Sequence, residues 1–152
     1  MAKPTVADMM VAYAEDAVDY AKSRLGETLD YSEASVEAVE RCLDQMYREV
    51  PRGLLGRLFK KSPTAEEKDV AAKMFGGYVG EVYRKHHGGE WALDTTIVPG
   101  SVTIALQHTE VGTIFPPAKV FKRLINGAED NVWSYYRVLI TEPSLRTSRP
   151  EP

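Results

Sequence analysis

The chain has 152 residues, of which 43% are hydrophobic and 27% are charged, as is typical of one globular domain with a substantial core. Its apolar runs are only a few residues long, which excludes a membrane-spanning helix of about 20 residues. A single cysteine, Cys42, excludes an internal disulfide, and the charged N-terminal stretch is not typical of a secretory signal. We therefore expect a single domain over residues 1–152, located in the cytoplasm and without a membrane partner.

Charge is divided unevenly along the chain. Residues 1–50 contain 11 acidic and 5 basic side chains, a net charge of −6, whereas residues 51–152 contain 11 acidic and 14 basic side chains, a net charge of +3. A net acidic chain without a combined basic and aromatic motif disfavours nucleic acid as a partner. The asymmetry instead directs attention to the acidic N-terminal third as a surface for a protein partner.

The first predicted helix begins at Thr5, which has the capping spacing to Asp8, and ends at Leu25-Gly26. Its apolar residues recur with a helical period at Val6, Met10, Tyr13, Ala17, Tyr20 and Ala21. Asp16 and Asp19 lie off this stripe, and together with Glu15 they give the helix an acidic group that a partner could contact.

A second helix is predicted to begin near Asp30 or Ser32, because Asp30 and Glu33 also have the capping spacing. Pro51 ends it, and its core face consists of Val36, Val39, Leu43, Met46 and Val50, with Cys42 on the apolar side as a small buried residue. An acidic row is predicted along its outside: Glu33, Glu37, Glu40 and Asp44. The short connection predicts that the first two helices pack as an antiparallel hairpin.

Residues 51–63 alternate four basic residues with Leu54, Leu55, Leu58 and Phe59. One interpretation is a segment that binds a membrane surface or nucleic acid. The other is a connector whose apolar residues tuck under the helices while Lys60 and Lys61 face water. The segment is too short for stable membrane anchoring, which favours the connector.

A long central helix is predicted to start between Ser62 and Thr64 and to stop at His86-His87-Gly88-Gly89. Gly76 and Gly80 lie one turn apart on one face of this helix, although each glycine costs about 1 kcal/mol relative to alanine. Close packing of another element against bare backbone explains them most simply. The alternative is a groove for a ligand or partner.

Two strands follow, predicted at residues 91–98 and 102–107, with a turn at Val98-Pro99-Gly100-Ser101. Because a two-stranded ribbon is marginal alone, it must lean on a helix or on a third strand. Residues 109–117 are predicted to be a loop or a short third strand that ends in a proline pair.

Two C-terminal helices complete the prediction. The first spans Ala118 to Asn126 and ends at Gly127, with Val120, Phe121, Leu124 and Ile125 inward and Lys119, Lys122 and Arg123 outward. The second opens at Glu129 or Asp130 and carries Val132, Trp133, Tyr136, Leu139 and Ile140; residues 141–152 read as a loose tail. The predicted fold class is α+β: an N-terminal helical hairpin (1–50), then a core (64–140) of a long central helix, a small antiparallel sheet and two C-terminal helices.

Three short segments carry a resemblance to known proteins: Tyr78-Val79-Gly80-Glu81, His87-Gly88-Gly89-Glu90-Trp91, and Phe115-Pro116 with residues 119–123 and Asn126-Gly127. The pattern resembles that of small bacterial proteins of unknown function, some of which look like immunity proteins paired with secreted antibacterial toxins. The resemblance covers roughly residues 64–136 and involves mostly glycines, aromatics and core residues. It implies no catalytic residue, and it leaves the N-terminal helices as the expected place for recognition of a particular partner.

Few residues are arranged for chemistry. The donors His86, His87, Glu90, His108 and Glu110 suit a metal, but adjacent helical histidines point about 100° apart, so we expect no metal and no other cofactor. Glu81 is either a structural partner of Arg84 or Lys85 or a general base, and no second catalytic group has a fixed relation to it. The nucleophile elbow, the phosphate-binding loop and the dinucleotide fingerprint are all missing from the sequence.

Two functions remain from different classes. The first is a non-catalytic protein-binding module, most concretely an immunity-type inhibitor that occludes the basic active site of a toxin through Glu15, Asp16, Asp19, Glu33, Glu37, Glu40 and Asp44. The second is a small enzyme or ligand-binding protein with a pocket formed by Gly80, Glu81, Arg84, His86 and Trp91. The acidic surface itself has two interpretations: it is a solvated face that keeps the protein soluble, or it meets a basic partner, whose association its carboxylates would speed.

Overall fold

The structure is a computed structural model that describes residues 3–49 and 65–141. Four predictions fall outside the described residues: the end of the second helix at Val50 and Pro51, the connector 51–63, the helix-start signals between Ser62 and Thr64, and the tail beyond Thr141. Among the described residues, no helix is both long enough and apolar enough to cross a membrane.

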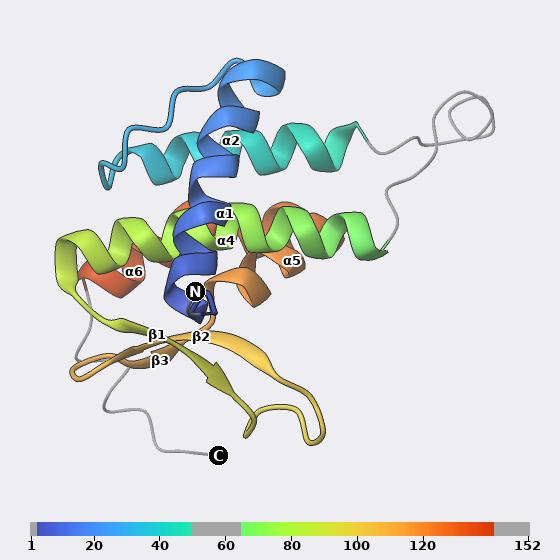
Figure 1. Ribbon diagram of the computed structural model, residues 1–152. Helices are drawn as coiled ribbons and strands as arrows, with labels where there is room; N and C mark the ends of the chain where they lie inside the picture. Colours follow the sequence, from blue (N-terminus) through green and yellow to red (C-terminus); the bar gives the residue numbers. More distant parts are fainter. Residues whose placement is uncertain (1–2, 50–64, 142–152) are drawn as a thin grey trace.

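The described residues form five α-helices and one three-stranded antiparallel sheet, in the α+β class that the sequence predicts. The helices are α1 (Val6–Tyr20), α2 (Ser35–Arg48), α4 (Ala65–His87), α5 (Pro116–Asn126) and α6 (Val132–Thr141). The strands are β1 (Glu90–Asp94), β2 (Thr103–His108) and β3 (Gly112–Ile114). Helix α4 runs through the middle, with α1 crossing in front of it, α5 and α6 behind it, and the sheet at one end of the molecule (Figure 1).

The ends of α1 follow the signals in its sequence. The Asp8 amide donates to Thr5 Oγ1 and the Thr5 amide donates to the Asp8 carboxylate, both at 3.0 Å, which is a complete capping box. The helix continues through one π-helical turn, Ala21–Leu25, and stops at Gly26, whose φ of 70° favours glycine. The predicted start and end of this helix are confirmed.

Helix α2 begins later than predicted because the chain first makes a tight turn. The Asp30 carboxylate accepts hydrogen bonds from the amide and the hydroxyl of Ser32, so it does not cap a helix that starts there. Tyr31, between them, is left-handed with a φ of 64°, and its amide donates to the hydroxyl of Tyr78 on α4 at 2.7 Å. Asp30 and Ser32 therefore hold the turn itself together, and the Tyr31 amide anchors it to α4.

The two N-terminal helices follow one another as predicted, but each finds its main partner elsewhere in the fold. Helix α1 packs chiefly on α4, whereas α2 packs on α5 and α6. Small residues explain the first contact, because a Cβ at Gly77 would lie only 3.0 Å from the Met10 carbonyl oxygen. The buried Ala14 and Ala17 also let α1 approach α4 closely. The two helices are therefore consecutive in the sequence, but they do not form the predicted antiparallel hairpin, because their main packing partners differ.

The glycines of α4 mark places where other elements meet its backbone. A Cβ at Gly76 would lie 2.4 Å from the Cα of Pro117, and a Cβ at Gly80 would lie 2.1 Å from the indole of Trp91. Such distances leave no room for any side chain. The close-packing interpretation of Gly76 and Gly80 is confirmed, and the faces of these two glycines are closed.

The sheet has the strand order β1-β2-β3, with Trp91 opposite Leu106 and Leu106 opposite Ile114. Strand β1 ends at Asp94, earlier than the predicted Val98, because the Asp94 carboxylate accepts the amide hydrogens of the next turn and interrupts the ladder. The predicted turn from Val98 to Ser101 is present, closed by a 3.0 Å backbone hydrogen bond. Of the two alternatives for residues 109–117, the short third strand is correct.

Helix α5 starts at Pro116, two residues earlier than predicted, with both prolines in its first turn, where a missing amide hydrogen costs nothing. The prediction of its inward face is wrong at two positions, because Ile125 is 48% exposed and Arg123 is completely buried. Gly127, with a φ of 87°, ends the helix as predicted, and a short 3₁₀ turn, Ala128–Asp130, leads into α6.

Candidate functional site

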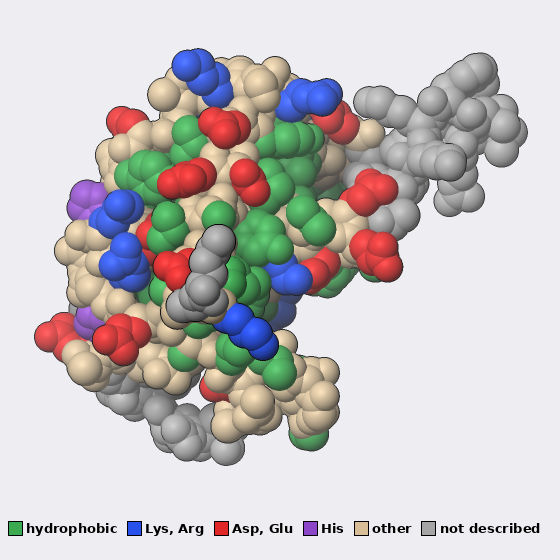
Figure 2. Space-filling model, viewed as in Figure 1, with side chains coloured by type: hydrophobic (Ala, Val, Ile, Leu, Met, Phe, Trp, Pro, Cys, Tyr) green, Lys and Arg blue, Asp and Glu red, His purple; other side chains and the backbone are tan. Residues whose placement is uncertain are grey.

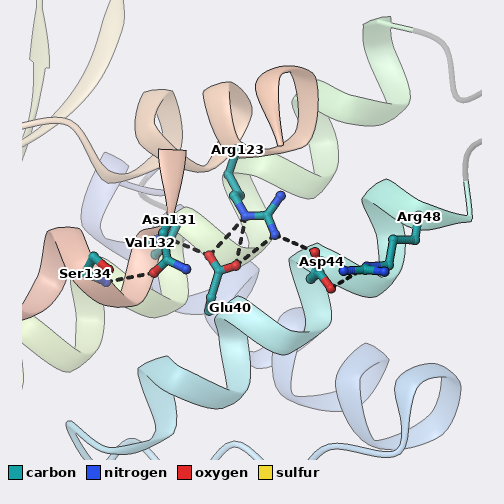
Figure 3. A network of polar contacts seen from close by, with 7 residues as sticks. All are labelled: Glu40, Asp44, Arg48, Arg123, Asn131, Val132 and Ser134. Carbon is teal, nitrogen blue, oxygen red and sulfur yellow. Dashed lines mark hydrogen bonds and ion pairs between the residues drawn. The ribbon is translucent and has the colours of Figure 1, made fainter. Parts of the chain in front are cut away.

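Most side chains of the acidic row predicted along α2 form ion pairs or hydrogen bonds with other residues of the fold. Arg123 of α5 donates from Nε to Glu40 at 2.9 Å and from Nη2 to Asp44 at 2.8 Å, as Figure 3 shows. Burial disfavours the charge on Arg123, yet these two carboxylates outweigh it and raise the guanidinium pKa above its ordinary value. The prediction that Glu40 lies on the outside of α2 is therefore wrong, because it neutralises a buried arginine on the opposing helix. Asp44 contacts the same arginine but stays partly exposed and also pairs with Arg48 at 2.7 Å.

Glu40 also joins a third element to this network. One of its oxygens accepts the amide hydrogen of Val132, at the start of α6, at 2.8 Å. Asn131 caps the same helix through the Ser134 amide, also at 2.8 Å (Figure 3). The ion pairs of Arg123 with Glu40 and Asp44, together with the hydrogen bond from the Val132 amide, thus fasten α2, α5 and α6 together.

Glu33, at the other end of the row, also bonds to other residues of the fold. Its carboxylate accepts from the hydroxyl of the buried Tyr136 at 2.6 Å and contacts His87 Nε2 at 2.8 Å. Partial burial favours the neutral acid, but these hydrogen bonds prevail and lower the pKa of Glu33 below its ordinary value. Of the four predicted acids on this row, only Glu37 is exposed without a hydrogen bond or ion pair to a described residue.

The carboxylates of α1 behave differently. Glu15, Asp16 and Asp19 are all exposed, and their carboxylates form no hydrogen bond or ion pair with any residue in the described ranges. Glu15 and Asp19 are four residues apart, so they lie one above the other on the outer face of the helix. Figure 2 shows acidic side chains gathered over the middle of α1. The structure therefore separates the predicted acidic surface into a free group on α1 and a paired row on α2.

Exposed apolar side chains accompany the free carboxylates. Met9 is 44% exposed and Val11 is 38% exposed, and both lie on α1 within two turns of Glu15. Helix α1 contains no basic residue from Val6 to Tyr20. We call the exposed side of α1, with Met9, Val11, Glu15, Asp16 and Asp19, the acidic α1 face.

The residues of the predicted pocket pack against one another. The Trp91 indole lies on Gly80 and donates from Nε1 to Glu81 at 2.9 Å, while Arg84 donates to the same carboxylate at 2.7 Å. Burial opposes ionisation of Glu81, but these bonds from Arg84 and Trp91 lower its pKa overall. His86 points elsewhere, with Nε2 3.0 Å from the Tyr31 carbonyl oxygen. The structural interpretation of Glu81 as the partner of Arg84 is confirmed.

The three histidines each contact protein groups. His87 pairs with Glu33, and His108 Nε2 donates to the His87 carbonyl oxygen at 2.9 Å while its Nδ1 accepts the Glu110 amide hydrogen. Within the described ranges, no group of three or more histidine, cysteine or acidic side chains is placed to hold a metal ion. Cys42 is buried, and desolvation raises its thiol pKa to about 12, so it is the small core residue that the sequence predicts.

Sequence reasoning missed Arg123, although a signal was present. The buried positions of α5 include Pro116, Val120, Arg123 and Leu124, followed by Gly127 after the helix end. Their spacing of three and four residues places Arg123 on the apolar stripe. A charged residue on such a stripe indicates a buried ion pair, and the acidic row of α2 was the available partner.

Comparison with known proteins adds no relative to this description. No protein-family model, no curated protein and no solved structure matches the chain. The resemblance to bacterial immunity-type proteins consequently rests on the sequence pattern alone.

Proposed function

We propose that this chain is a non-catalytic protein-binding module that engages a basic partner through its acidic α1 face. The observation that carries the proposal is the group of unpaired carboxylates Glu15, Asp16 and Asp19 on two turns of one helix. Like charges four residues apart on a helix destabilise it by about 0.2–0.5 kcal/mol. The fold bears this cost without a compensating contact in the described residues, whereas it neutralises Glu33, Glu40 and Asp44 internally.

The mixture of side chains on the acidic α1 face suits a protein partner. Met9 and Val11 offer apolar area, and the carboxylates around them would lie at the polar rim of an interface. Acidic side chains at a rim accelerate association with a basic surface, and they act mainly on the association rate.

In its most specific form, the proposal is that the partner is a toxin whose active site binds an anionic substrate, such as a nucleotide or nucleic acid. The acidic α1 face would imitate that substrate and occlude the site, as an immunity-type inhibitor in the cytoplasm. Its support is the sequence resemblance and the position of the acidic group on an N-terminal helix. The use of Glu81, Arg84 and His87 in internal contacts also favours binding over catalysis.

The proposal is tested in two steps. A photo-crosslinking residue at the exposed Ala12, in the centre of the face, would capture the partner, with products of neighbouring genes screened first. Association kinetics are then measured for the wild type and for Glu15→Lys/Asp19→Lys. The matched control is Glu37→Lys/Glu110→Lys, which changes the net charge equally at two other exposed acids.

We expect the α1 variant to lower the association rate at low salt by at least tenfold more than the control variant. The difference should shrink in 1 M salt, where the Debye length is about 3 Å. Equal rates for the two variants would refute the α1 interface. A captured partner whose catalytic activity is unaffected by binding would refute the inhibitor form while leaving the binding proposal standing.

A further inference from the structure

Large apolar side chains are left uncovered on the ribbon formed by β1 and β2, which we call the β1–β2 hairpin. The ten large hydrophobic side chains that are exposed among the described residues include four on this hairpin: Leu93, Ile97, Val98 and Val102. Three more lie on α1: Met9, Val11 and Tyr20. In Figure 1 the hairpin extends below the helices. Exposed apolar residues are therefore concentrated on two elements and are not scattered singly, which marks a surface for interaction.

One face of the hairpin continues outward from the core. Trp91 and Leu106 lie opposite one another in the ladder and are only 7% and 0% exposed. The next pair on the same face joins Leu93 to Ile104, because side chains two residues apart in a strand point to the same side. Leu93 is 58% exposed. This apolar face is therefore covered by the helices at the base of the hairpin and open towards its tip.

The hairpin adjoins α1 and shares its charge, since β1 and α1 contact each other. Helix α1 contains four carboxylates and residues 90–107 contain two, yet neither segment contains a lysine, an arginine or a histidine. Glu90 is exposed. Hydrogen bonds from the hydroxyl and the amide of Thr96 hold the pKa of Asp94 below its ordinary value, so Asp94 stays ionised. The two elements together present an apolar and acidic surface.

This composition distinguishes between two kinds of partner. An edge strand can pair with a second copy of the same chain, and β1 is an edge strand of the sheet. Pairing two copies through this surface would bring negative charges together, which opposes self-association. A different protein with an apolar groove bordered by lysine or arginine would complement both the apolar side chains and the carboxylates.

We propose that the β1–β2 hairpin is the apolar half of the partner interface, and that its open face enters an apolar groove bordered by basic residues. The inference rests on the proposed function, since the partner is the protein that the acidic α1 face attracts, and it adds the chemistry of the partner's surface. The two halves act on different rate constants. The carboxylates of α1 set the association rate, whereas the apolar side chains of the hairpin set the dissociation rate, because they form contacts only after the surfaces have met.

The kinetic test removes two apolar side chains from the hairpin. Dissociation of the captured partner is measured for Ile97→Ser/Val98→Ser and for a matched control, Ile125→Ser/Val138→Ser. The control removes the same two residue types from α5 and α6, at positions that are 48% exposed, as Val98 is. We expect the hairpin variant to dissociate at least tenfold faster than the control and to keep the wild-type association rate. The difference should persist in 1 M salt, because salt does not screen apolar contacts.

The two proposals fail in different ways. Equal dissociation rates for the hairpin variant and its control would refute the hairpin interface, even where Glu15→Lys/Asp19→Lys still slows association. Equal association rates for that α1 variant and its own control would instead refute the acidic α1 face.

Crosslinking tests the location without removing any contact. A photo-crosslinking residue at Val102, which is 60% exposed, should capture the same protein as the one at Ala12. A different protein, or none, at Val102 would overturn the hairpin interface. If neither position captures a protein, the proposed function fails with it.

Sedimentation of the free chain tests a second copy as the occupant. We expect a monomer, and a dimer that Ile97→Ser/Val98→Ser abolishes would overturn the inference in favour of self-association. The substituted positions are exposed, so we expect both double variants to keep a melting temperature close to that of the wild type. Circular dichroism checks this, and the Val102 crosslink decides the location independently of the hairpin variant.

Discussion

At the scale of single residues, Arg123 is the most consequential side chain of this fold. It is completely buried, and its Nη1 atom has no hydrogen-bond partner among the residues that the structure describes. Its charge is neutralised by Glu40 and Asp44, which lie 83 and 79 residues earlier in the chain. Removing one member of a buried ion pair is costly because the remaining charges stay desolvated, whereas replacing all members together is often neutral.

This asymmetry predicts the behaviour of two variants. Arg123→Met alone should lower the free energy of unfolding by about 3 kcal/mol, because Glu40 and Asp44 are left facing an apolar side chain. Arg123→Met/Glu40→Gln/Asp44→Asn should recover more than half of that loss, since an amide at position 40 still accepts from the Val132 amide. Urea denaturation monitored by circular dichroism measures both. A single variant as stable as the wild type would show that the network adds no net stability.

At the scale of elements, the sequence predicted well what depends on neighbours in the chain. The capping box of Thr5 and Asp8, which starts α1, and the glycines that follow three helices are local signals, and each marks a helix terminus where the sequence predicts it. Packing partners depend on contacts between distant segments, which short-range patterns do not encode. Short-range patterns therefore predict that α1 and α2 pack on each other and that Asp30 starts a helix, and the structure shows neither.

The candidate site also combines features that the sequence predicts with features that depend on contacts between distant segments. The free carboxylates of α1 were predicted correctly as exposed, because they lie off a clear apolar stripe. Glu40 and Asp44 also lie off the apolar stripe of α2, but a buried arginine from another helix covers them. The apolar pocket lined by Tyr20, Met46, Phe75 and Leu124 has no signal in the sequence, because these residues come from four different helices.

The joint between α4 and β1 gives a prediction at this scale. Alanine is favoured over glycine in a helix by about 1 kcal/mol, but a Cβ at Gly80 would lie 2.1 Å from the Trp91 indole. The indole is held by its hydrogen bond to Glu81, so Gly80→Ala should destabilise the chain by about 1–3 kcal/mol. In a Trp91→Leu background the clash is removed, and Gly80→Ala should become neutral or stabilising.

Thermal or urea unfolding of the four proteins in this double-mutant cycle measures the coupling between positions 80 and 91. The informative result is a change in the sign of the Gly80→Ala effect on stability between the two backgrounds. Such a change is independent of the general effect that each single substitution has on stability. If Gly80→Ala costs the same in both backgrounds, the indole is not the reason for glycine at this position.

At the scale of the whole molecule, the acidic residues of the N-terminal third include two groups with different surroundings, which we call two populations. One population, with Glu33, Glu40 and Asp44, joins α2 to α4, α5 and α6 and stabilises the fold. The other, on the acidic α1 face, makes no stabilising pair among the described residues. Proteins commonly give up some stability at surfaces that serve function, so the two populations should respond in opposite directions when they are neutralised.

The last prediction separates these populations without knowledge of the partner. Glu15→Gln/Asp19→Asn removes a like-charge pair worth about 0.2–0.5 kcal/mol, so at low salt it should raise the melting temperature by about 1–2 °C. Glu40→Gln, the control, removes one charge from the buried network and should lower the melting temperature. In 1 M salt the gain of the α1 variant should vanish, because exposed charges are screened, whereas the loss at Glu40 should persist. Scanning calorimetry at two ionic strengths measures all three proteins. If neutralising Glu15 and Asp19 instead lowers the melting temperature at low salt, these carboxylates stabilise the fold, and the partner surface must be sought on another face.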